Sequence, residues 1–471
     1  MSGPADSAPP APRDAYLAFR NPGYRLYSVG NFISVIGRQM LGVAISLEVF
    51  HRTKSATALG LIGLASALPV IFLALPAGQL ADRFNRRRII IITQILGALT
   101  SVGLTIVSVR VDIVPQLPIL QYFANGLLWV AEFFHEKAGN VAFGPETPLI
   151  FFLLLLNGIA RTFGWAARSP FMANLVPRAA LANAVTWGSS LFEIGSITGP
   201  ALGGYMVKLC GYPTVYALDA VCSIAFVGFL LPIHVRQESF TAGSHPLRDL
   251  FSGLRFVAQT KVILATITLD LFAVLLGGAT ALLPMFADQI LGIDAMGLGI
   301  LRSAQSIGAV AMAITIAHLP PMKRAGWTML FAVAGFGAAT IIFGLSHWFW
   351  FSFLALALAG AFDNISVVVR HTLVQVLTPD AMRGRVAAVN NIFIGSSNEL
   401  GAFESGVTAA LFGPVISVVA GGIGTILVVI ATALRWPEVR QIGPLILAED
   451  ESSPPLETLP EAKPGDPLPP P

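Results

Sequence analysis

The sequence predicts an all-α integral membrane protein with twelve transmembrane helices in two pseudo-symmetric six-helix bundles. Of its 471 residues, 55% are apolar and only 12% are charged. A water-soluble domain cannot bury that much apolar surface. The apolar residues form runs of about 20, the length that a helix needs to cross a bilayer. A weak internal repeat divides these runs into two sets of six.

Each expected span follows from one apolar run. Twelve spans place both ends of the chain on the same side of the membrane, and we expect that side to be the cytoplasm. The expected spans are residues 26–49, 56–77, 88–109, 148–167, 182–208, 212–233, 261–286, 296–318, 326–345, 347–371, 385–411 and 414–435.

Three segments outside the spans are polar or rich in proline. Residues 1–23 and 437–471 are expected to be disordered cytoplasmic tails, and the first lacks the apolar core of a cleaved signal peptide. Residues 235–260 are expected to be a cytoplasmic linker. They separate an N-terminal bundle, residues 24–234, from a C-terminal bundle, residues 261–436.

The lysine and arginine residues support this orientation. With cytoplasmic tails, most of the 29 lysines and arginines lie on the cytoplasmic side, where positive charge is favoured. Counting the apolar stretch 117–139 as a thirteenth span would place most of the positive charge outside, so we do not expect it to span. The outer side carries Arg52, Lys54, Arg110, Lys137 and Lys208.

Two short sequence matches relate the halves. ALGLIGLASA, from Ala58, resembles AMGLGILRSA, from Ala295. LVPRAALANAV, from Leu175, resembles LTPDAMRGRVAAV, from Leu377. The two members of the second pair are fewer residues apart in the chain than the two members of the first pair. The first half therefore has more residues between its two matched segments than the second half has. Residues 110–147, in the outer loop between spans 3 and 4, are the place for this insertion.

The insertion has the pattern of an amphipathic helix. Gln121, Asn125, Glu132 and Glu136 recur at helical spacing opposite an apolar face. Such a helix lies along the outer membrane face or caps the helix bundle. Two roles remain open, a tolerated spacer and a lid over the outer exit.

The motif GQLADRFNRRR follows the second span. It resembles a loop motif of the major facilitator superfamily of membrane transporters. Asn85 stands where that family usually has a second glycine, and we expect it to tolerate left-handed backbone geometry. A simple positive anchor on the cytoplasmic side is the alternative. The resemblance implies a gating latch that holds the outward-open state, formed by Gly78, Asp82, Arg83, Arg86 and Arg87.

The fifth span contains GSITGPALGG, which matches the same family's antiporter motif. Small residues let helices approach closely, and a proline kinks a helix and frees a carbonyl group. Ordinary packing of small residues is the alternative. The resemblance implies an exporter that exchanges its substrate for protons, with the motif residues Gly195, Gly199, Pro200, Gly203 and Gly204.

The second half carries a narrower resemblance. The stretches ALLPMFADQILG, VVVRHTLVQVLTPDAMRGRV and IGSSNELGAFESG look like the enterobactin-exporter-like branch of the superfamily, which includes macrolide efflux pumps. In the fourth span, Arg161 begins a shortened version of the family's R-x-x-q-G motif. The insertion at 110–147 is outside the pattern of this branch.

Several charged and polar residues fall within the expected spans, where they are costly and usually serve a cavity or a partner. The resemblance places spans 1, 4, 7 and 10 along the transport path. We therefore expect proton coupling from Arg161, Asp270 or Asp363. The substrate cavity is expected to include Asn31, Ser34, Arg38 and Asn364. Structural charge pairs are expected for Glu193, Arg302, Arg370, Glu399 and Glu404.

Other chemistries are not indicated. No Gly-Lys pair is present to form a phosphate-binding P-loop, and no histidine or cysteine cluster has metal-binding spacing. Cys210 and Cys222 are expected to be free thiols. The sequence therefore predicts no enzyme activity, no cofactor, no metal and no nucleic-acid partner.

The function that these patterns predict is secondary active transport. We expect a monomer in the inner membrane that exports a small molecule, such as a siderophore, a macrolide or another drug-like amphipathic compound. Proton antiport and alternating access would drive export. A proton-coupled importer on the same fold is one alternative, and a membrane sensor or scaffold that transports nothing is another.

Overall fold

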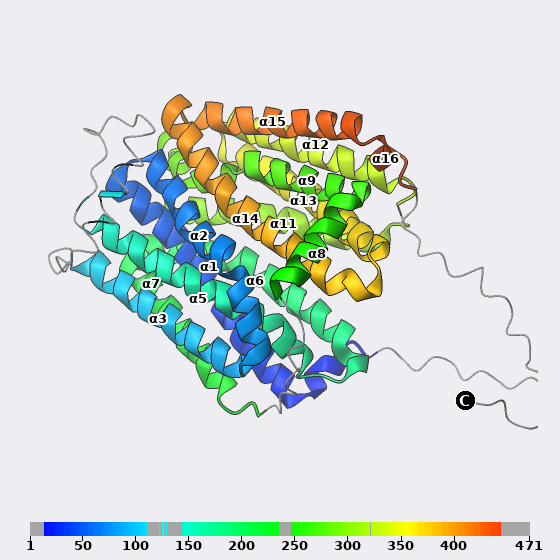
Figure 1. Ribbon diagram of the computed structural model, residues 1–471. Coiled ribbons are helices and arrows are strands. Elements are labelled where there is room, and N and C mark those ends of the chain that lie inside the picture. The colour runs from blue at the N-terminus through cyan, green and yellow to red at the C-terminus, as the bar shows by residue number, and fades with distance from the viewer. Residues whose placement is uncertain are drawn as a thin grey trace, which may run out of the picture.

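A computed structural model describes residues 14–110, 146–234, 246–320 and 322–443, together with residues 122, 125, 126, 129 and 144. All regular secondary structure in these ranges is helical (Figure 1). Ten of the described helices are long and apolar enough to cross a membrane. The all-helical membrane class that the sequence predicts is therefore confirmed.

The first group of helices contains the elements before residue 235. Residues 17–20 and 178–180 add short 3-10 turns before α1 and α6. The long helices are α1 (Pro22–Thr53), α2 (Ala56–Arg83), α3 (Arg86–Val109), α5 (Thr147–Ala173), α6 (Leu181–Cys210) and α7 (Tyr212–Leu230). We call them the N-terminal group.

The second group follows the short helix α8 (Pro246–Gln259). Between α9 and α11 the chain forms a 3-10 turn, the short helix α10 (Leu283–Phe286) and a π-turn. The remaining helices are α9 (Lys261–Leu276), α11 (Ala295–His318), α12 (Ala325–Gly344), α13 (Phe349–Leu377), α14 (Asp380–Phe412), α15 (Pro414–Arg435) and α16 (Pro437–Arg440). We call α9 to α16 the C-terminal group.

Local sequence explains where several helices begin. Asn21 accepts hydrogen bonds from the backbone N–H groups of Gly23 and Tyr24 at the start of α1. Ser55 caps α2 in the same way. Gly211 and Gly413 stand at equivalent tight turns, before α7 and α15, with φ of +79° and +89°. Glycine adopts this backbone conformation without a steric penalty.

The long helices alternate in direction between two ends of the molecule. We call the end at which α1 begins and α15 ends the tail end, and the opposite end the far end. At the tail end, Lys261 pairs with Glu438 at 2.8 Å, which joins α9 to α16. At the far end, Lys54 pairs with Asp288 at 3.0 Å, which joins the N-terminal group to the C-terminal group.

Most helix packing occurs within each group. In the N-terminal group, α1 packs against α6 and α7, and α5 packs against α2 and α3. In the C-terminal group, α13 packs against α11 and α12, and α15 packs against α12 and α9. Two extensive interfaces join the groups, between α2 and α14 and between α6 and α11 (Figure 1).

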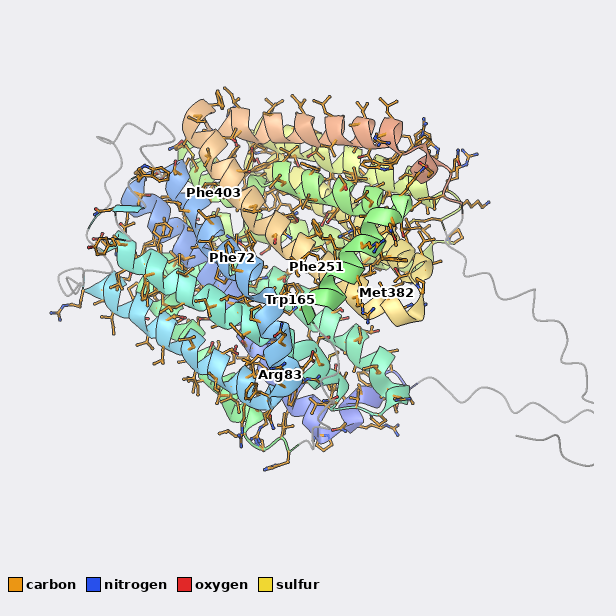
Figure 2. All side chains as sticks on the ribbon, viewed as in Figure 1. Phe72, Arg83, Trp165, Phe251, Met382 and Phe403 are labelled. Carbon is orange, nitrogen blue, oxygen red and sulfur yellow. The ribbon has the colours of Figure 1, made fainter. Side chains whose placement is uncertain are left out.

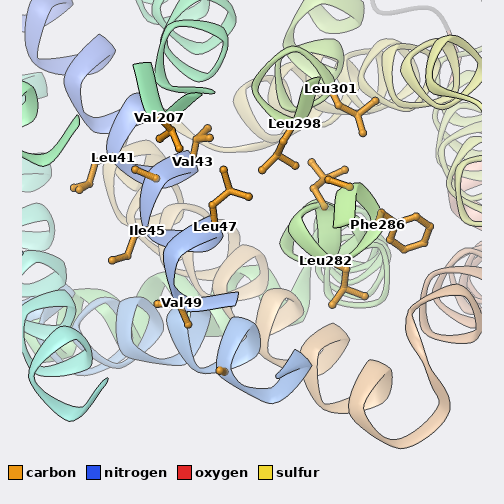
Figure 3. Close-up of a cluster of buried hydrophobic side chains, with 14 of the residues drawn as sticks. Leu41, Val43, Ile45, Leu47, Val49, Val207, Leu282, Phe286, Leu298 and Leu301 are labelled. Carbon is orange, nitrogen blue, oxygen red and sulfur yellow. The ribbon is translucent and has the colours of Figure 1, made fainter. Parts of the chain in front are cut away.

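The apolar core is continuous at the far end and divided at the tail end. One far-end cluster combines Leu47 of α1 and Val207 of α6 with Phe286 and Leu298 of the C-terminal group (Figure 3). Toward the tail end, the N-terminal group has its own cluster, which includes Tyr24, Ile90, Phe171 and Phe226. The C-terminal group has a separate cluster, which includes Leu269, Met329, Val369 and Val429.

Two expected spans differ from the others. Residues 182–208 and 385–411 lie in α6 and α14, but neither helix is among the ten that are apolar enough to cross a membrane by composition. Both helices form the interfaces between the groups. Helices that pack tightly against other helices carry small and polar residues in place of large apolar ones.

The seventh expected span, residues 261–286, is interrupted. Helix α9 ends at Leu276, and Gly277 and Gly278 follow it. A Cβ atom on Gly278 would lie 2.5 Å from both the Gly401 carbonyl oxygen and the Ser405 hydroxyl oxygen. The close approach of α14 therefore requires glycine at this break.

The insertion is described at only a few positions. Tyr122, Asn125, Gly126 and Trp129 are helical and exposed. The rest of the expected amphipathic helix, including Gln121, Glu132 and Glu136, lies outside the described residues, as do the expected tails before residue 14 and after residue 443.

Candidate functional site

The two groups meet backbone to backbone in the far-end halves of their helices. At the interface of α2 and α14, a Cβ atom on Gly406 would lie 2.5 Å from the Gly60 Cα atom. At the interface of α6 and α11, a Cβ atom on Gly204 would lie 2.2 Å from the Ala295 carbonyl oxygen. Both contacts are possible only because glycine has no side chain.

Ion pairs cross the same end of the molecule. Besides the pair of Lys54 and Asp288, Lys208 at the end of α6 pairs with Asp294 at 2.7 Å. Asp294 also caps α11 by accepting a hydrogen bond from the Gly297 N–H group at 2.9 Å. The Lys208 hydrogen bond and this backbone bond lower the pKa of the Asp294 carboxyl group below its ordinary value.

Apolar side chains are exposed toward the tail end, where the groups separate. Phe72 of α2 is 70% exposed and Trp165 of α5 is 51% exposed. Both lie along the boundary between the two groups in the view of Figure 2. Phe192 of α6 and Ile314 of α11 are exposed as well. The apolar cluster that both groups share lies at the far end, whereas the clusters toward the tail end belong to one group each.

Two arginines cross between the groups near the middle of the helices. The Arg161 guanidinium of α5 pairs with the Glu399 carboxylate of α14 at 2.5 Å. The Arg302 guanidinium of α11 donates to the Gly42 carbonyl oxygen of α1 at 3.4 Å. The sequence named Arg161 as a proton-coupling candidate and Glu399 as a structural partner, and the structure brings the two together.

The C-terminal group buries a second ion pair. Arg370 of α13 pairs with Asp270 of α9 at 2.9 Å, and both side chains are nearly inaccessible. Arg370 also donates to the Asn390 side-chain oxygen at 3.2 Å. Asp363 lies two helical turns before Arg370 on α13. Among the described residues it forms no hydrogen bond or ion pair of its own, although the charges of Asp270 and Arg370 act on it.

The cavity residues expected on α1 take part in a buried hydrogen-bond network. Arg38 donates to the Ser34 hydroxyl at 2.8 Å, and the Gln94 amide of α3 donates to the same oxygen at 2.9 Å. Arg168 of α5 donates to the Gln94 side-chain oxygen at 2.7 Å. In this structure Ser34 is fully buried, and its hydroxyl oxygen joins Arg38 to Gln94.

Two expected cavity residues have unused acceptors. The side-chain oxygens of Asn31 and Asn364 are buried and have no hydrogen-bond partner in the part of the chain that the structure describes. Buried polar atoms are normally hydrogen-bonded. An unused amide oxygen on α1 and another on α13 therefore indicate places where a ligand or water would donate.

The sequence reasoning missed a buried acid on α7. Asp219 is 1% exposed, and its carboxylate accepts a hydrogen bond from the Ser101 hydroxyl of α3 at 2.6 Å. Gln94 and Arg168 were missed as well. Asp219 stands within the expected span 212–233, so a complete search of that apolar run for ionisable residues would have found it.

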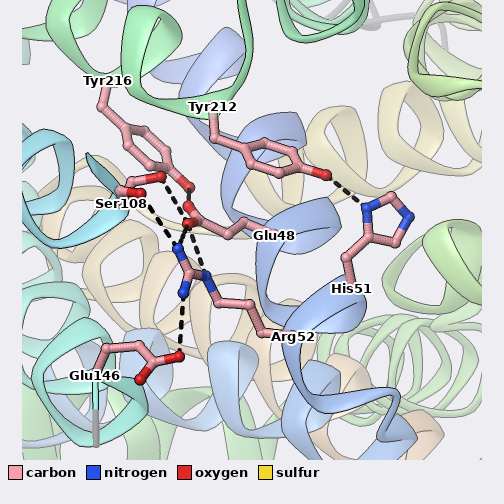
Figure 4. A network of polar contacts seen from close by, with 7 residues as sticks. All are labelled: Glu48, His51, Arg52, Ser108, Glu146, Tyr212 and Tyr216. Carbon is pink, nitrogen blue, oxygen red and sulfur yellow. Dashed lines mark hydrogen bonds and ion pairs between the residues drawn. The ribbon is translucent and has the colours of Figure 1, made fainter. Parts of the chain in front are cut away.

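A second missed network lies at the far end of the N-terminal group (Figure 4). The buried Glu48 carboxylate accepts hydrogen bonds from Arg52, Ser108 and Tyr216. Arg52 also pairs with Glu146 at 3.1 Å. Beside this network, His51 hydrogen-bonds to the Tyr212 hydroxyl at 2.5 Å. Glu48 lies near the end of the expected span 26–49, yet it was not counted among the charges at membrane depth.

The GQLADRFNRRR motif is mostly helical rather than a loop. Gly78 to Arg83 form the last turns of α2, and Asn85 caps α3 with φ of −62°, so the backbone at Asn85 is extended and makes no use of the left-handed geometry that asparagine tolerates. Asp82 is 70% exposed in its side chain and contacts Arg86 at 3.4 Å. Arg87 donates to the Leu230 carbonyl oxygen at 2.9 Å.

These contacts of Asp82 and Arg87 all lie within the N-terminal group. Arg83 lies at the tail end of that group in Figure 2 and is exposed. A Cβ atom on Gly78 would meet nothing within 4 Å. The described contacts of Gly78 and Asp82 therefore do not reach the C-terminal group.

The GSITGPALGG motif places α6 between two helices. Added Cβ atoms on Gly195, Gly199 and Gly203 would collide with Val35, Gln39 and Met40 of α1. On the other side, α6 packs against α11. A Cβ atom on Gly299 of α11 would lie only 2.4 Å from the Pro200 carbonyl oxygen. The Ser303 hydroxyl of α11 donates a hydrogen bond to the Ile197 carbonyl oxygen of α6 at 2.6 Å.

The two remaining charge-pair candidates have no cationic partner among the described residues. Glu404 accepts hydrogen bonds from the hydroxyls of Thr408, at 2.8 Å, and Ser405, at 3.4 Å. Glu193 on α6 is half-buried. Cys210 and Cys222 are free thiols. Within the described residues, no cluster of three or more His, Cys, Asp or Glu side chains could hold a metal ion.

Solved structures share this fold. A bacterial homolog of the human lysosomal transporter Spinster, in an inward-facing and unoccupied conformation, has a TM-score of 0.65 and 14% sequence identity, with 92% of this chain and 98% of that chain covered. A D-xylose-proton symporter has a TM-score of 0.64 and 16% identity, with 89% and 98% covered. At these identities the likeness concerns the fold alone.

Curated relatives are similar over nearly the whole chain. The enterobactin exporter EntS of Escherichia coli O1:K1 is 25% identical over 435 residues, which cover 91% of this chain and 96% of the relative. The same protein of Shigella boydii serotype 18 is similar to the same extent. The family model of the Major Facilitator Superfamily matches residues 27–326. The chain therefore belongs to the Major Facilitator Superfamily.

Proposed function

We propose that this multi-pass membrane transporter exports a small amphipathic molecule by proton antiport and alternating access. One observation carries the proposal: the apolar core is shared by both groups at the far end and divided between them at the tail end. That arrangement is one of the two states that alternating access requires, in which the substrate enters from the tail end.

The proposed architecture has twelve transmembrane helices in two halves. Helices α6 and α14 have 30 and 33 residues, which is longer than the roughly 20 that a bilayer requires. They therefore complete six spans in each group. The lysine and arginine distribution favours the cytoplasm at the tail end. The chain would then lie in the cell inner membrane with both tails cytoplasmic.

In this state the far end is the closed outer gate. Glycine contacts at Gly60 and Gly204 hold the halves together, and the ion pairs of Lys54 and Lys208 lie across the same seam. The proposed latch at Asp82 is released, since its contact to Arg86 stays within one half. In the outward-open state the latch would form, and the contacts of the outer gate would break.

Proton coupling is proposed for the acids on α9 and α13. Asp270 is neutralised by Arg370, whereas Asp363 has no direct partner among the described residues. A proton or a cationic substrate group that displaced Arg370 would change the charge balance at this site. Because substrate and proton would compete for the same acids, one would leave when the other binds.

The polar groups of the path support an amphipathic substrate. Asn31 and Asn364 offer unused acceptors, and Arg161, Glu399 and Arg302 supply both signs of charge near the middle of the helices. The exposed apolar side chains toward the tail end provide the complementary surface. A siderophore or a macrolide combines polar groups with apolar surface in this way.

The direction of transport is proposed from two sources. The GSITGPALGG motif matches the antiporter motif of the superfamily, and the curated relatives are enterobactin exporters, although at only 25% identity. Import on the same fold predicts the opposite flux. A scaffold predicts none.

The test is flux in inside-out membrane vesicles with an acidic interior, using radiolabelled enterobactin and erythromycin as separate probes. We expect at least one probe to accumulate in vesicles that contain the protein, and a protonophore to abolish the accumulation. Vesicles that contain the Asp270→Asn and Asp363→Asn variants serve as coupling controls, and at least one should lose the response to the pH gradient. Flux of the probe out of preloaded vesicles would overturn the proposal of export. Flux no greater than that of vesicles that lack the protein would overturn it as well.

A further inference from the structure

We propose that Asp219 is a proton-binding site inside the N-terminal group, separate from the acids of the C-terminal group. The proposal extends the proton antiport proposed above and rests on it for its role in transport. The site itself follows from how α1, α3 and α7 enclose one carboxyl group.

Three helices form the site. Asp219 of α7 is buried, and one of its carboxyl oxygens accepts the Ser101 hydrogen bond at 2.6 Å. The other carboxyl oxygen, Oδ1, is also buried and has no hydrogen-bond partner among the described residues. A Cβ atom on Gly37 of α1 would lie 2.9 Å from this oxygen. The glycine therefore leaves the space that the carboxyl group occupies.

The charged groups around the site come from several helices. On α1, Arg38 is close enough for its charge to act on Asp219, but it donates to Ser34 and forms no ion pair with the acid. On α3, the contact is the neutral hydroxyl of Ser101. On α7 itself, Cys222 lies one turn further, and Tyr216 one turn earlier donates to Glu48.

Helix α6, which also touches α7, carries two charged residues. Glu193 is half-buried, and Lys208 is held by Asp294 at the far end. No described cation therefore contacts the Asp219 carboxyl group. A buried carboxylate without a cationic partner or a full set of hydrogen bonds is costly, and the neutral acid avoids that cost.

Arg38 supplies the means of release. Arg38 is the residue after Gly37. Its guanidinium donates a hydrogen bond to the Ser34 hydroxyl, which also accepts one from Gln94. A rearrangement of α1 against α3 that broke the Ser34 bond would free Arg38 to pair with Asp219. The carboxyl proton would then leave to water, and the carboxylate would be neutralised by the arginine. Proton release at this site would thus follow movement within the N-terminal half.

The experiment measures the carboxyl group directly. Infrared difference spectra of the purified full-length protein, recorded between acidic and alkaline pH, report protonated carboxylic acids by their carbonyl-stretch band. We expect Asp219→Asn to remove one component of that band that Asp363→Asn leaves in place. A spectrum of Asp219→Asn with the full wild-type band would overturn the proposal, because Asp219 would then neither bind nor release a proton between the two pH values.

A second variant guards against loss of folding. Ser101→Ala keeps the carboxyl group and removes only its hydrogen-bond donor, so the Asp219 component should persist and move to higher frequency. An unchanged frequency would contradict the assignment. If Asp219→Asn removes the component but vesicle transport proves independent of the pH gradient, proton antiport fails while the proton site stands. The two proposals are therefore tested separately.

Discussion

The two ends of the molecule are built differently. At the far end, both groups share one apolar cluster, glycine backbones touch at two interfaces, and ion pairs cross the seam. At the tail end, each group has its own core, and Phe72 and Ile314 are exposed. Under the proposed alternating access, close packing is therefore concentrated where the halves would separate, and apolar side chains are exposed where they would close.

The difference shows how a transporter can favour one state without becoming rigid. Glycine contacts are close but hold little apolar area, because no side chain is present. The exposed ion pairs add about 0–1 kcal/mol each. The glycine contacts and ion pairs therefore add little to the cost of separating the groups, and the larger part comes from the shared apolar cluster, whose separation would expose apolar surface.

The largest effect is expected at the network beneath the far-end gate. Glu48→Ala leaves Arg52 with Glu146 as its acidic partner and removes the acceptor of Tyr216. Because breaking a buried ion pair costs about 3–5 kcal/mol, thermal unfolding followed by tryptophan fluorescence should shift clearly to lower temperature. His51→Ala, which removes only a hydrogen bond at an exposed residue, is the control. Equal melting temperatures for Glu48→Ala and wild type would show that the network is not structural.

The next effect is expected at the gate itself. Gly406→Ala places a methyl group against the Gly60 backbone, and overpacking of this kind costs about 1–3 kcal/mol. The population should therefore shift toward an open far end, roughly 5- to 150-fold. Spin labels at Leu209 and Phe412, in a background without native cysteines, would report a longer far-end distance. Gly97→Ala is the matched control, because a Cβ atom there meets nothing within 4 Å. An unchanged distance distribution would place the gate elsewhere.

A smaller effect, confined to activity, is expected at the tail end. Asp82→Asn alters an exposed side chain with one long contact, so the melting temperature should stay unchanged. If the latch forms in the other state, the variant should slow transport by about tenfold and keep labels at Val185 and Leu319 far apart. Arg83→Gln tests a second member of the motif. Full transport by Asp82→Asn in liposomes would remove the latch from the mechanism.

The smallest effect is expected at the ion pairs of the outer gate. Lys208→Gln should destabilise the closed far end by no more than about 1 kcal/mol, since both side chains of the pair are half-exposed. The folded pKa of Asp294 is lowered, so the pair contributes above the ordinary carboxyl pKa and is lost as pH falls through the lowered value. Far-end label distances should therefore be insensitive to pH near neutrality and increase only in strong acid. A transition near neutral pH would implicate a different group.

Much of the fold was predictable because membrane helices leave a strong signal. Apolar runs located the ten helices that meet the length and composition of a membrane span. The signal weakened at α6 and α14, whose small and polar residues serve packing between the halves. Some helices also extend beyond their apolar runs, as α1 shows, because its last turn carries His51 and Arg52 in place of apolar residues.

The site was predictable in residue types more than in partners. The sequence identified Arg161, Glu399, Asp270 and Arg370 as charges at membrane depth, but it assigned Arg161 and Glu399 to different roles. Their pairing depends on the approach of α5 to α14, which are far apart in the chain. Asp219 was missed for a simpler reason, since a single acid in a long apolar run changes its hydropathy little.

The membrane class, the approximate spans, the motifs and the family resemblance could be read from the sequence, because each depends on residues that are close together in the chain. The end at which the groups pack closely, the pairing of the charges and the acid left without a cation became visible in the folded molecule. Those properties depend on contacts between helices such as α2 and α14, and in a protein that changes state they depend on the state as well.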